Sequence, residues 1–562
     1  MAPRMFQPIT LHFNFSINMK KIIVFFTVLH LLSFSVYSQP TKTPTPFLQR
    51  PKLVVGIVID QMRWDFLYRF DKRYLANGFK RLLANGFSCE NTFIPYLPTY
   101  TAPGHTCIYT GSVPAIHGII GNNWYDRNTH KQIYCTDDTT VHSVGSTSDA
   151  GNMSPANLWT STITDELRLA TNFKSKVIGI ALKDRGAILP AGHAANAAYW
   201  FDNANGAFIS STYYMIALPE WVNQFNNRKL PGQYLQTNWN TLYPIDTYAQ
   251  SDSDRKTYEK NLPGEDNTFP HHTADISKEK YDALRTTPYG NTLTIEMAKA
   301  AIKGEQLGKS GNTDFLAVSF SSTDYVGHTF GPNSIEAEDT YLRLDKDLAS
   351  FLNYLDSAVG KGQYTVFLTA DHGAAHIPGY AALQAHLPGG SVSANAIQAA
   401  LNDTLNKYFK PKNGVEEVIN EQVYLSRDIN DSIRLAIKSL IVRQLLAMPF
   451  VANAVDLSQV SNASLIATQK TMLTNGYNQK ISGDIQFLLK PQWIEGSSKG
   501  TTHGAWNPYD AHIPLVWFGW GINKGSTNRE TYMTDIAATV AALLHIQMPN
   551  GCIGKVIQEV VK

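Results

Sequence analysis

The sequence predicts an α/β fold with a largely parallel central sheet flanked by helices and with inserted lid-like segments. Apolar runs rich in β-branched residues recur along the chain, as in strands that are covered on both faces. Amphipathic helical patterns lie between these runs, and strands that alternate with helices favour parallel pairing. Hydrophobic residues make up 43% of the 562 residues and charged residues 17%, so the chain can bury a large core.

Five apolar runs are the predicted strands of this sheet. Each is short and is bounded by polar or glycine residues, as strands commonly are. The runs span residues 52–60, 176–182, 314–320, 364–370 and 513–519.

The clearest predicted helix runs from Ser334 to Val359. Apolar residues recur along it at spacings of three and four from Tyr341 to Leu355, which places them on one face. Acidic residues in its first turns and Gly360 after its last residue match the helix dipole and the preference for glycine beyond a helix end.

Two segments fit the strand-helix alternation poorly, and we interpret both as insertions over the sheet. The first, at about residues 206–272, is polar and aromatic with frequent turn residues. The second, at about residues 389–479, has a helix-strand-helix pattern of its own. Lids and ordinary decoration remain open as alternatives. The catalytic domain is predicted to span residues 40–562.

Residues 19–38 have the three-part pattern of a secretory signal peptide. Two lysines follow Met19, an apolar run extends from Ile22 to Val36, and small residues surround Ser38. Residues 1–18 are interpreted as sequence upstream of the true start. We therefore expect a periplasmic or secreted protein with no stable membrane anchor after cleavage. An uncleaved anchor is the alternative, but the run is short for a membrane span.

Charge and cysteine content exclude several classes of partner and site. The net charge is only +2 and no basic block occurs, so no nucleic-acid partner is expected. The four cysteines have no spacing typical of a disulfide scaffold or a cysteine zinc site, and the sequence does not choose among their pairings. They are Cys89, Cys107, Cys135 and Cys552.

Aspartate and histidine side chains follow three of the predicted strands, and one histidine precedes the last strand, at the edge where α/β proteins bind ligands. Each alone is typical of a helix cap or a structural histidine, so the interpretation rests on the group. Three aspartates and three histidines are enough for two divalent ions; such mixed sets suit zinc, with manganese or another ion open. The six candidate ligands are Asp60, Asp324, His328, Asp371, His372 and His503.

The stretch "YLPTYTAPGHTCIYTG" places a threonine hydroxyl at a predicted helix start. Pro103 suits the first turn of a helix, since its missing N–H would be unpaired there. Thr101 then lies at the helix N-terminus, where the dipole and free N–H groups stabilise negative charge. A metal-bound alkoxide at Thr101 would be a competent nucleophile. The alternative is that Thr101 or Thr99 only caps the helix.

Two cations and one amide lie near the same predicted edge. "LKDRG" provides Lys183 and Arg185, which point the same way if the strand continues through them. Such a pair would suit a dianionic phosphate. Asn122 in "GIIGNNW" is able to donate to a phosphoryl oxygen. A solvated strand end and a turn residue are the alternatives.

These motifs together resemble the alkaline phosphatase superfamily, and most closely its phosphate-irrepressible, PafA-type alkaline phosphatases, which are relatives of the nucleotide pyrophosphatase/phosphodiesterases. The matching pieces follow in family order from about Lys52. They include "VVGIVIDQMRWD", "PTYTAPGHTCIYTGSVPAIHGIIGNNW", "KDRGAILPAGHAANAAYWFD", "SSTDYVGHTFGP", "TADHG" and "THGAWNPYDAHIP".

The resemblance implies an alkaline phosphatase-like fold and an enzyme that hydrolyses small phosphate monoesters with two Zn²⁺ per chain. A monomer is expected, but the sequence does not give the oligomeric state. The resemblance makes Thr101 the nucleophile, in preference to Thr99, and the site of a phosphothreonine intermediate. It assigns one zinc to Asp324, His328 and His503. It assigns the other zinc to Asp60, Asp371, His372 and Thr101. Asn122, Lys183 and Arg185 would bind the non-bridging phosphoryl oxygens. A metal-activated nucleophile must lose a proton, so we expect an alkaline optimum.

Other activities of the same fold are weighed by particular residues. A phosphodiesterase or nucleotide pyrophosphatase would use the same metals, but family diesterases typically lack the pair Lys183 and Arg185. Cys107 lacks the sulfatase pattern, and export and the threonine disfavour a mutase. A catalytically dead binding protein is disfavoured because every expected ligand position is filled. Supporting or packing roles are expected for His105, His117, His193, Asp510 and His512.

Overall fold

The computed structural model describes residues 10–11, 49–264, 266–276, 280–409 and 414–562. The predicted signal peptide at 19–38 and the residues upstream of it lie outside this range, apart from residues 10–11. Residues 50–562 form one unit, which is described here by itself. None of its described helices combines the length and apolar character that a bilayer crossing requires.

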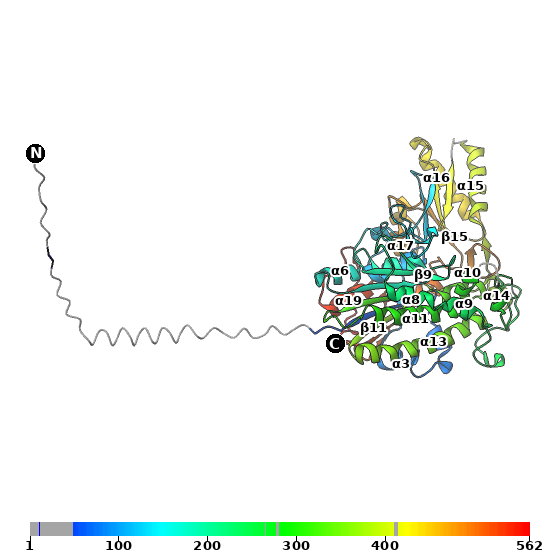
Figure 1. Cartoon of the computed structure of the whole chain (residues 1–562). Coiled ribbons are helices and arrows are strands. Elements are labelled where there is room, and N and C mark those ends of the chain that lie inside the picture. The colour runs from blue at the N-terminus through cyan, green and yellow to red at the C-terminus, as the bar shows by residue number, and fades with distance from the viewer. Residues whose placement is uncertain (1–9, 12–48, 265, 277–279, 410–413) are drawn as a thin grey trace, which may run out of the picture. The chain divides into compact units, whose positions relative to one another are not determined.

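A ten-stranded sheet organises this unit, and its centre is parallel (Figure 1). Strand β1 (Leu53–Ile59) lies between β11 (Tyr364–Thr369) and β10 (Asp314–Phe320). On the far side of β10, the parallel order continues to β7 (Val177–Ala181) and β8 (Ala197–Asp202). The prediction of a largely parallel sheet flanked by helices is therefore confirmed.

Antiparallel pairs occur on both sides of this parallel centre. Strand β9 (Ala207–Ser211), from the start of the first predicted insertion, pairs with β8 across a short turn, and β6 (Ser143–Val144) follows it. Toward the other edge, β19 (Leu515–Gly519) runs antiparallel to β11, and β2 (Phe87–Cys89) and β20 (Gly525–Thr527) lie beyond it. The predicted strand at 513–519 is split, because Pro514 has no N–H to donate to a ladder. Residues His512–Ile513 form β18 and pair elsewhere, with β3 (Thr92–Phe93).

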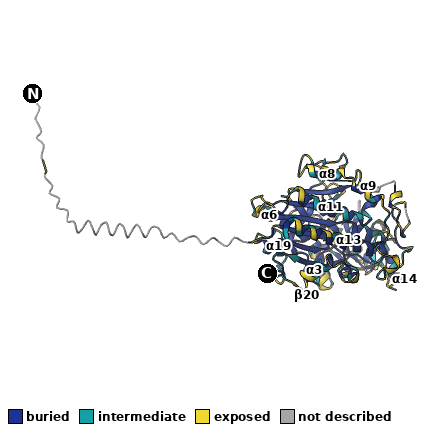
Figure 2. Ribbon diagram, turned by 60° about the horizontal axis from the view of Figure 1, so that its bottom comes forward, coloured by how far each residue is buried: buried dark blue, intermediate teal, exposed yellow. Residues whose placement is uncertain are grey.

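Helices cover the sheet and bury its central strands. Every residue of β1, β7, β10 and β11 is buried, as the apolar runs predict. Helices α11 (Tyr289–Gly304) and α13 (Ile335–Leu355) pack together, while α4 (Thr101–Thr110) packs on α7 (Asp184–Ala191) and α19 (Asp535–Leu544). Figure 2 shows the buried strands inside, with exposed residues on outer helices such as α8 (Glu220–Asn227).

The long predicted helix is confirmed as α13, with a short π-helical extension. The Ser334 side chain caps its start by accepting from the Ala337 N–H. A π-helical turn over Asp356–Gly360 follows directly, and Gly360 takes a positive φ of 116° where the chain leaves the helix.

Residues 390–489 build a second, smaller sheet, and we call this segment the accessory subdomain. Its strand order is β13 (Val415–Ile419), β14 (Gln422–Leu425), β16 (Ile485–Leu489) and β15 (Val451–Asp456). Helices α15 (Ala394–Tyr408) and α16 (Asp431–Ala447) pack on this sheet, and together they share a separate hydrophobic cluster. In Figure 1 the two helices and β15 lie together at one end of the unit, in yellow. Strand β16 lies beyond residue 479, so the sheet extends past the second predicted insertion.

Candidate active site

Three buried aspartates lie at the carboxyl ends of three adjacent parallel strands. Asp60 directly follows β1, Asp371 lies just beyond β11, and Asp324 lies in α12 (Ser322–Phe330) after β10. Their exposed fractions are 0%, 0% and 2%. Because β10, β1 and β11 are neighbours in register, their ends bring the three carboxylates to one point.

Three histidines face this point with the same ring atom. In each ring Nδ1 lies against a backbone carbonyl, which can only accept, so Nδ1 carries the proton. The carbonyl partners are Gly373 O at 2.9 Å for His372, Thr501 O at 2.7 Å for His328 and Thr99 O at 2.7 Å for His503. When neutral, each ring presents the Nε2 lone pair, which is the atom a divalent ion would use.

The ligand atoms form two groups that share Asp324. Asp324, His328 and His503 lie with one ligand atom each within 4.8 Å of one another, and so do Asp60, Asp324 and His372. Asp371 lies beside the second group, with Oδ2 3.4 Å from His372 Nε2. Asp60 Oδ1 and Asp371 Oδ2 are buried and have no hydrogen-bond partner within the described residues. Unpaired buried carboxylate oxygens beside imidazole lone pairs fit divalent cations.

Thr101 begins α4 and its hydroxyl points at the cluster. Thr101 is 1% exposed, and its Oγ1 lies 3.3 Å from His372 Nε2. Because that nitrogen is the unprotonated one, the threonine hydroxyl is the donor. The predicted helix over this stretch is confirmed, with Gly111 ending it in the left-handed region.

Thr99 was considered as a helix cap and as an alternative to Thr101, and the structure shows a further contact role. It does not cap α4, whose cap residue is Tyr100 with no side-chain hydrogen bond. Its hydroxyl donates to Ala505 O and accepts from the Gly504 N–H, both at 3.1 Å. Together with its carbonyl contact to His503, Thr99 holds the loop that carries this histidine.

Lys183 lies inside the cluster. Its ammonium donates to Asp60 Oδ2 at 2.5 Å and to Asp324 Oδ2 at 2.6 Å, and the residue is 3% exposed. Burial opposes its charge, but the two carboxylates outweigh this and raise the pKa of Lys183 well above its usual value. The cation is therefore permanent and stands next to the groups that would hold a metal.

Arg185 lies in the first turn of α7, not in an extended strand as the alternation argument requires. The strand geometry does not continue past Lys183, because α7 begins at Asp184, so simple alternation does not align the two cations. Arg185 Nη1 instead donates to the Tyr134 hydroxyl at 2.8 Å, and its Nε is buried with no partner among the described residues. An unpaired buried guanidinium N–H is available to an anion.

The side chain of Asn122 is held by its oxygen at the start of α4. Its Oδ1 accepts from the Ala102 N–H at 2.9 Å, in the first turn of α4. This bond ties the loop before β4 (Asn123–Asp126) to the start of the helix that carries Thr101. With Oδ1 occupied, Nδ2 is the group that remains for a ligand.

Burial and neighbouring charges separate the pKa values of the carboxyls. Burial, with repulsion from Asp324 and Asp371, raises the pKa of Asp60 well above its usual range. Burial alone would raise the pKa of Asp324 too, but His328 and Lys183 outweigh it and hold that pKa well below the usual range. The cluster thus has an excess of buried negative charge that Lys183 only partly neutralises, which favours bound cations.

One supporting residue, Gln61, was not singled out by sequence. Gln61 donates from Nε2 to Asp324 Oδ1 at 2.6 Å and from its backbone N–H to Asp371 Oδ1 at 3.2 Å. It has a positive φ of 65°, unusual for glutamine, and only its place directly after Asp60 pointed to it. His105, expected to have a supporting role, contacts Thr101 O at 2.9 Å and Ser319 Oγ at 2.8 Å.

The other expected supporting residues lie outside the cluster. Each makes a local contact that stabilises a loop or strand end. His117 Nδ1 accepts from the Ile119 N–H, His193 Nε2 lies against Thr160 O, Asp510 accepts from the Ala505 N–H, and His512 Nε2 lies against Glu90 O.

This sheet, with its aspartates and histidines around a threonine at a helix start, defines an α/β protein of the alkaline phosphatase superfamily. The chain belongs to the type I phosphodiesterase / nucleotide pyrophosphatase family, whose profile matches residues 54–510.

Curated relatives and solved structures agree with this assignment. The chain is 52% identical over 553 residues to alkaline phosphatase PhoV of Synechococcus elongatus, covering 97% of this chain and 100% of that one. It is 50% identical over 526 residues to alkaline phosphatase PafA of Elizabethkingia meningoseptica, covering 92% and 96%. A 53% identical relative from Myroides odoratus, covering 92% and 95%, has the name calcium-transporting ATPase. The PafA-type resemblance is confirmed.

The crystal structure of wild-type PafA matches with a TM-score of 0.89 at 50% identity, over 92% of this chain and 100% of that one. A PafA variant in which one threonine, one asparagine, one lysine and one arginine are replaced matches equally well, with a TM-score of 0.89 over the same shares of the two chains.

Proposed function

We propose that this chain is an exported, zinc-dependent alkaline phosphatase that hydrolyses phosphate monoesters through Thr101. The observation that carries the proposal is the pair of Asp/His ligand groups that share Asp324, with the Thr101 hydroxyl 3.3 Å from His372 Nε2 of the second group. The names of the relatives PhoV and PafA support the same activity.

Two Zn²⁺ ions per chain fit the donor set. Asp324, His328 and His503 would hold one; Asp60, Asp371 and His372 would hold the other, beside the Thr101 oxygen. The neutral Nε2 lone pairs and the unpaired oxygens of Asp60 and Asp371 support this division. When bound, the two ions supply Lewis-acid chemistry, which lowers the pKa of a hydroxyl and stabilises a leaving oxygen.

The chain's own residues then account for both half-reactions. Thr101 Oγ1 attacks phosphorus, a bond forms between this oxygen and phosphorus, and the ester bond breaks to release the alcohol. Water next cleaves the phosphothreonine, which restores the hydroxyl and releases phosphate. The N-terminal end of α4 stabilises negative charge on Oγ1 in both steps.

Asn122, Lys183 and Arg185 are proposed to bind the non-bridging phosphoryl oxygens. The amide of Asn122, the buried ammonium of Lys183 and the unpaired Nε of Arg185 support this role. The residue types replaced in the PafA variant occur in the same order here as Thr101, Asn122, Lys183 and Arg185. Preorganised donors of this kind stabilise charge that develops on the transferring group.

A phosphodiesterase or nucleotide pyrophosphatase is the second candidate, favoured by the name of the matching family. A diester has one fewer negative charge and a second ester group. Two cations at Lys183 and Arg185 favour the dianionic monoester, so the pair distinguishes the two activities.

The decisive experiment compares an aryl phosphate monoester with the matching diester on the purified, metal-loaded protein. We expect kcat/KM for the monoester to be the larger by several orders of magnitude. A preference for the diester would overturn the monoesterase assignment, and absence of both metal and hydrolysis would support a binding protein on this fold. N-terminal sequencing tests export: a mature start near Met1 would contradict it.

A further inference from the structure

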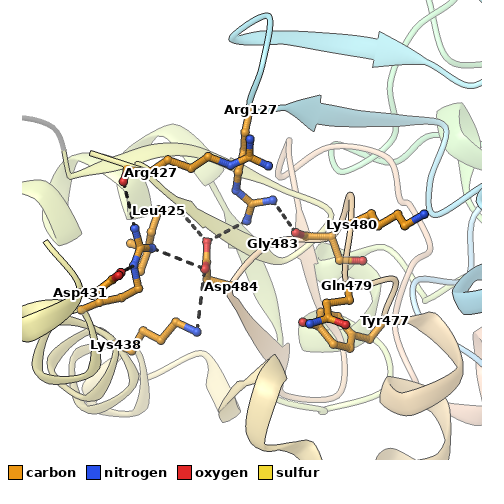
Figure 3. A pocket seen from close by; sticks show the side chains of 12 residues that line it. Arg127, Leu425, Arg427, Asp431, Lys438, Tyr477, Gln479, Lys480, Gly483 and Asp484 are labelled. Carbon is orange, nitrogen blue, oxygen red and sulfur yellow. Dashed lines mark hydrogen bonds and ion pairs between the residues drawn. The ribbon is translucent and has the colours of Figure 1, made fainter. Parts of the chain in front are cut away.

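A second polar cavity, of about 300 Å³, lies where the accessory subdomain meets the hairpin of β4 and β5 (Lys131–Tyr134) (Figure 3). It is bounded by the end of β14, one face of α16 and the loop at residues 477–484. Five basic and two acidic side chains line it. They are Arg127, Arg427, Arg434, Lys438 and Lys480, with Asp431 and Asp484.

Asp484 is outnumbered by the cations that surround it. Arg127 Nη2 lies 2.8 Å from its carboxylate, Lys438 Nζ 3.9 Å and Arg434 Nη1 4.0 Å. Figure 3 shows the Arg127 and Lys438 side chains directed at the Asp484 carboxylate. Their side chains are 11%, 13% and 23% exposed, so water screens them only partly. Lys438 has a second carboxylate partner, Asp456, at 3.0 Å.

Two further cations of the cavity are paired with neutral groups. Arg427 Nη1 donates to the Asn128 side-chain oxygen at 2.8 Å. Lys480 Nζ lies 5.7 Å from the ring centroid of Trp159. Neither the amide nor the ring carries a negative charge, although Arg427 also interacts electrostatically with Asp126. The other lining carboxylate, on Asp431, is fully exposed and therefore contributes little.

We propose that this cavity is a second, non-catalytic binding site for a small phosphate-class dianion. Guanidinium groups match the oxygens of phosphate in pairs, and three arginines converge here with two lysines. The volume is that of a small-molecule site, which favours inorganic phosphate or a phosphoryl group on a small molecule over a polymer. A charged, concave surface also concentrates such anions.

The site draws on both parts of the chain. Arg127 comes from the turn after β4, the strand that begins directly after Asn122, whereas Arg427, Arg434 and Lys438 belong to the accessory subdomain. Arg127 Nη1 also donates to Ser482 O at 2.8 Å, which fixes the guanidinium in the cavity wall. A bound dianion would join the hairpin to the subdomain through shared contacts.

Equilibrium dialysis of the metal-loaded full chain with radiolabelled inorganic phosphate tests the proposal. We expect two classes of phosphate site in the wild type. The double variant Arg427→Gln/Lys480→Gln should weaken one class by about tenfold or more and leave turnover of an aryl phosphate unchanged. These two side chains are chosen because Arg127 and Arg434 also hold backbone carbonyls, so their loss would disturb the fold.

Arg443→Gln is the matched control, since Arg443 is exposed on α16 and does not line the cavity. It should leave both classes intact. Lys183→Ala/Arg185→Ala should weaken only the other class, so failure of the proposed catalytic role would leave this site measurable. A single class in the wild type, a second class that survives the double substitution, or binding of long-chain polyphosphate without binding of phosphate would each overturn the proposal. Displacement by methylphosphonate would identify phosphorylated small molecules as ligands, and its absence would identify free phosphate.

Discussion

The imidazole ring of His372 lies parallel to that of His503, with ring centroids 3.4 Å apart and planes 14° apart. Two protonated rings at this distance would repel strongly. Burial lowers the pKa of both histidines, and in His503 repulsion from His372 adds to the effect. Both rings are therefore neutral at neutral pH, and their Nε2 lone pairs are available to metal ions without prior loss of a proton.

Removal of metal should abolish turnover and lower thermal stability. Ions that bind only the folded chain stabilise it, by about 3–4 kcal/mol at concentrations of 100 to 1,000 times Kd. We expect a chelator to lower Tm and activity together, and Zn²⁺ to restore both. Elemental analysis should find two zinc ions per chain. The same chelator presaturated with zinc is the control, and full activity of a metal-free sample would contradict the site.

Thr101→Ala should reduce kcat/KM for an aryl phosphate by at least about 10³-fold, because the attacking oxygen is lost. Thr99→Ala is the matched control, because Thr99 is also a buried threonine and lies just before the start of the same helix. It removes two hydrogen bonds to the loop that carries His503, so we expect it to cost about 1–2 kcal/mol of stability and to retain much of the turnover. Equal losses of turnover in the two variants would undo the assignment of Thr101.

Lys183→Ala and Arg185→Ala should each reduce monoester kcat/KM by about 10²–10³-fold and diester kcat/KM by much less. The reason is that the second charge of the monoester is the one these cations offset. Lys256→Ala, which breaks the ion pair with Asp252 outside the site, serves as the control for loss of a partly buried lysine. Unchanged selectivity between the two substrates would remove the discriminating role.

Gln61→Leu should weaken metal binding by about 10–100-fold although no proposed ligand is lost. The side-chain amide of Gln61 orients Asp324, and leucine cannot donate to that carboxylate. Competition with a zinc chelator measures the change. Gln61→Asn is a second variant for comparison, because it keeps the amide group on a side chain that is too short to reach the Asp324 carboxylate. Wild-type affinity in Gln61→Leu would show that Asp324 is oriented by its other partners alone.

Glu259→Gln should stabilise the protein increasingly as pH rises. Burial and repulsion from Glu336 raise the pKa of Glu259 to about 10, against 4.5 in an unfolded chain. Between these values the folded state retains a proton that the unfolded state releases, so wild-type stability falls with rising pH. We expect the Tm of the variant to exceed that of the wild type more at about pH 9 than at about pH 5. Exposed Glu220→Gln should show no such trend, and a pH-independent difference for Glu259→Gln would contradict the account.

Local sequence patterns were sufficient for the elements that carry the site. The apolar runs at β1, β7, β10 and β11 and the helix start at Thr101 depend on neighbouring residues only. The antiparallel direction of β19 and its late start were not predicted, since strand pairing is decided by distant partners. The strand alternation expected through Lys183 and Arg185 also fails, because α7 begins at Asp184.

By itself, the sequence determined the order of strands and helices and the residue types that follow each strand, because periodicity and helix-start preferences are local. Only the tertiary structure decided which atoms meet. The carbonyls that orient His328 and His503 lie 173 and 404 residues away along the chain, and Lys183 reaches Asp324 across 141 residues. Such contacts follow from the lateral order of β11, β1, β10 and β7, which is set by packing of the whole sheet.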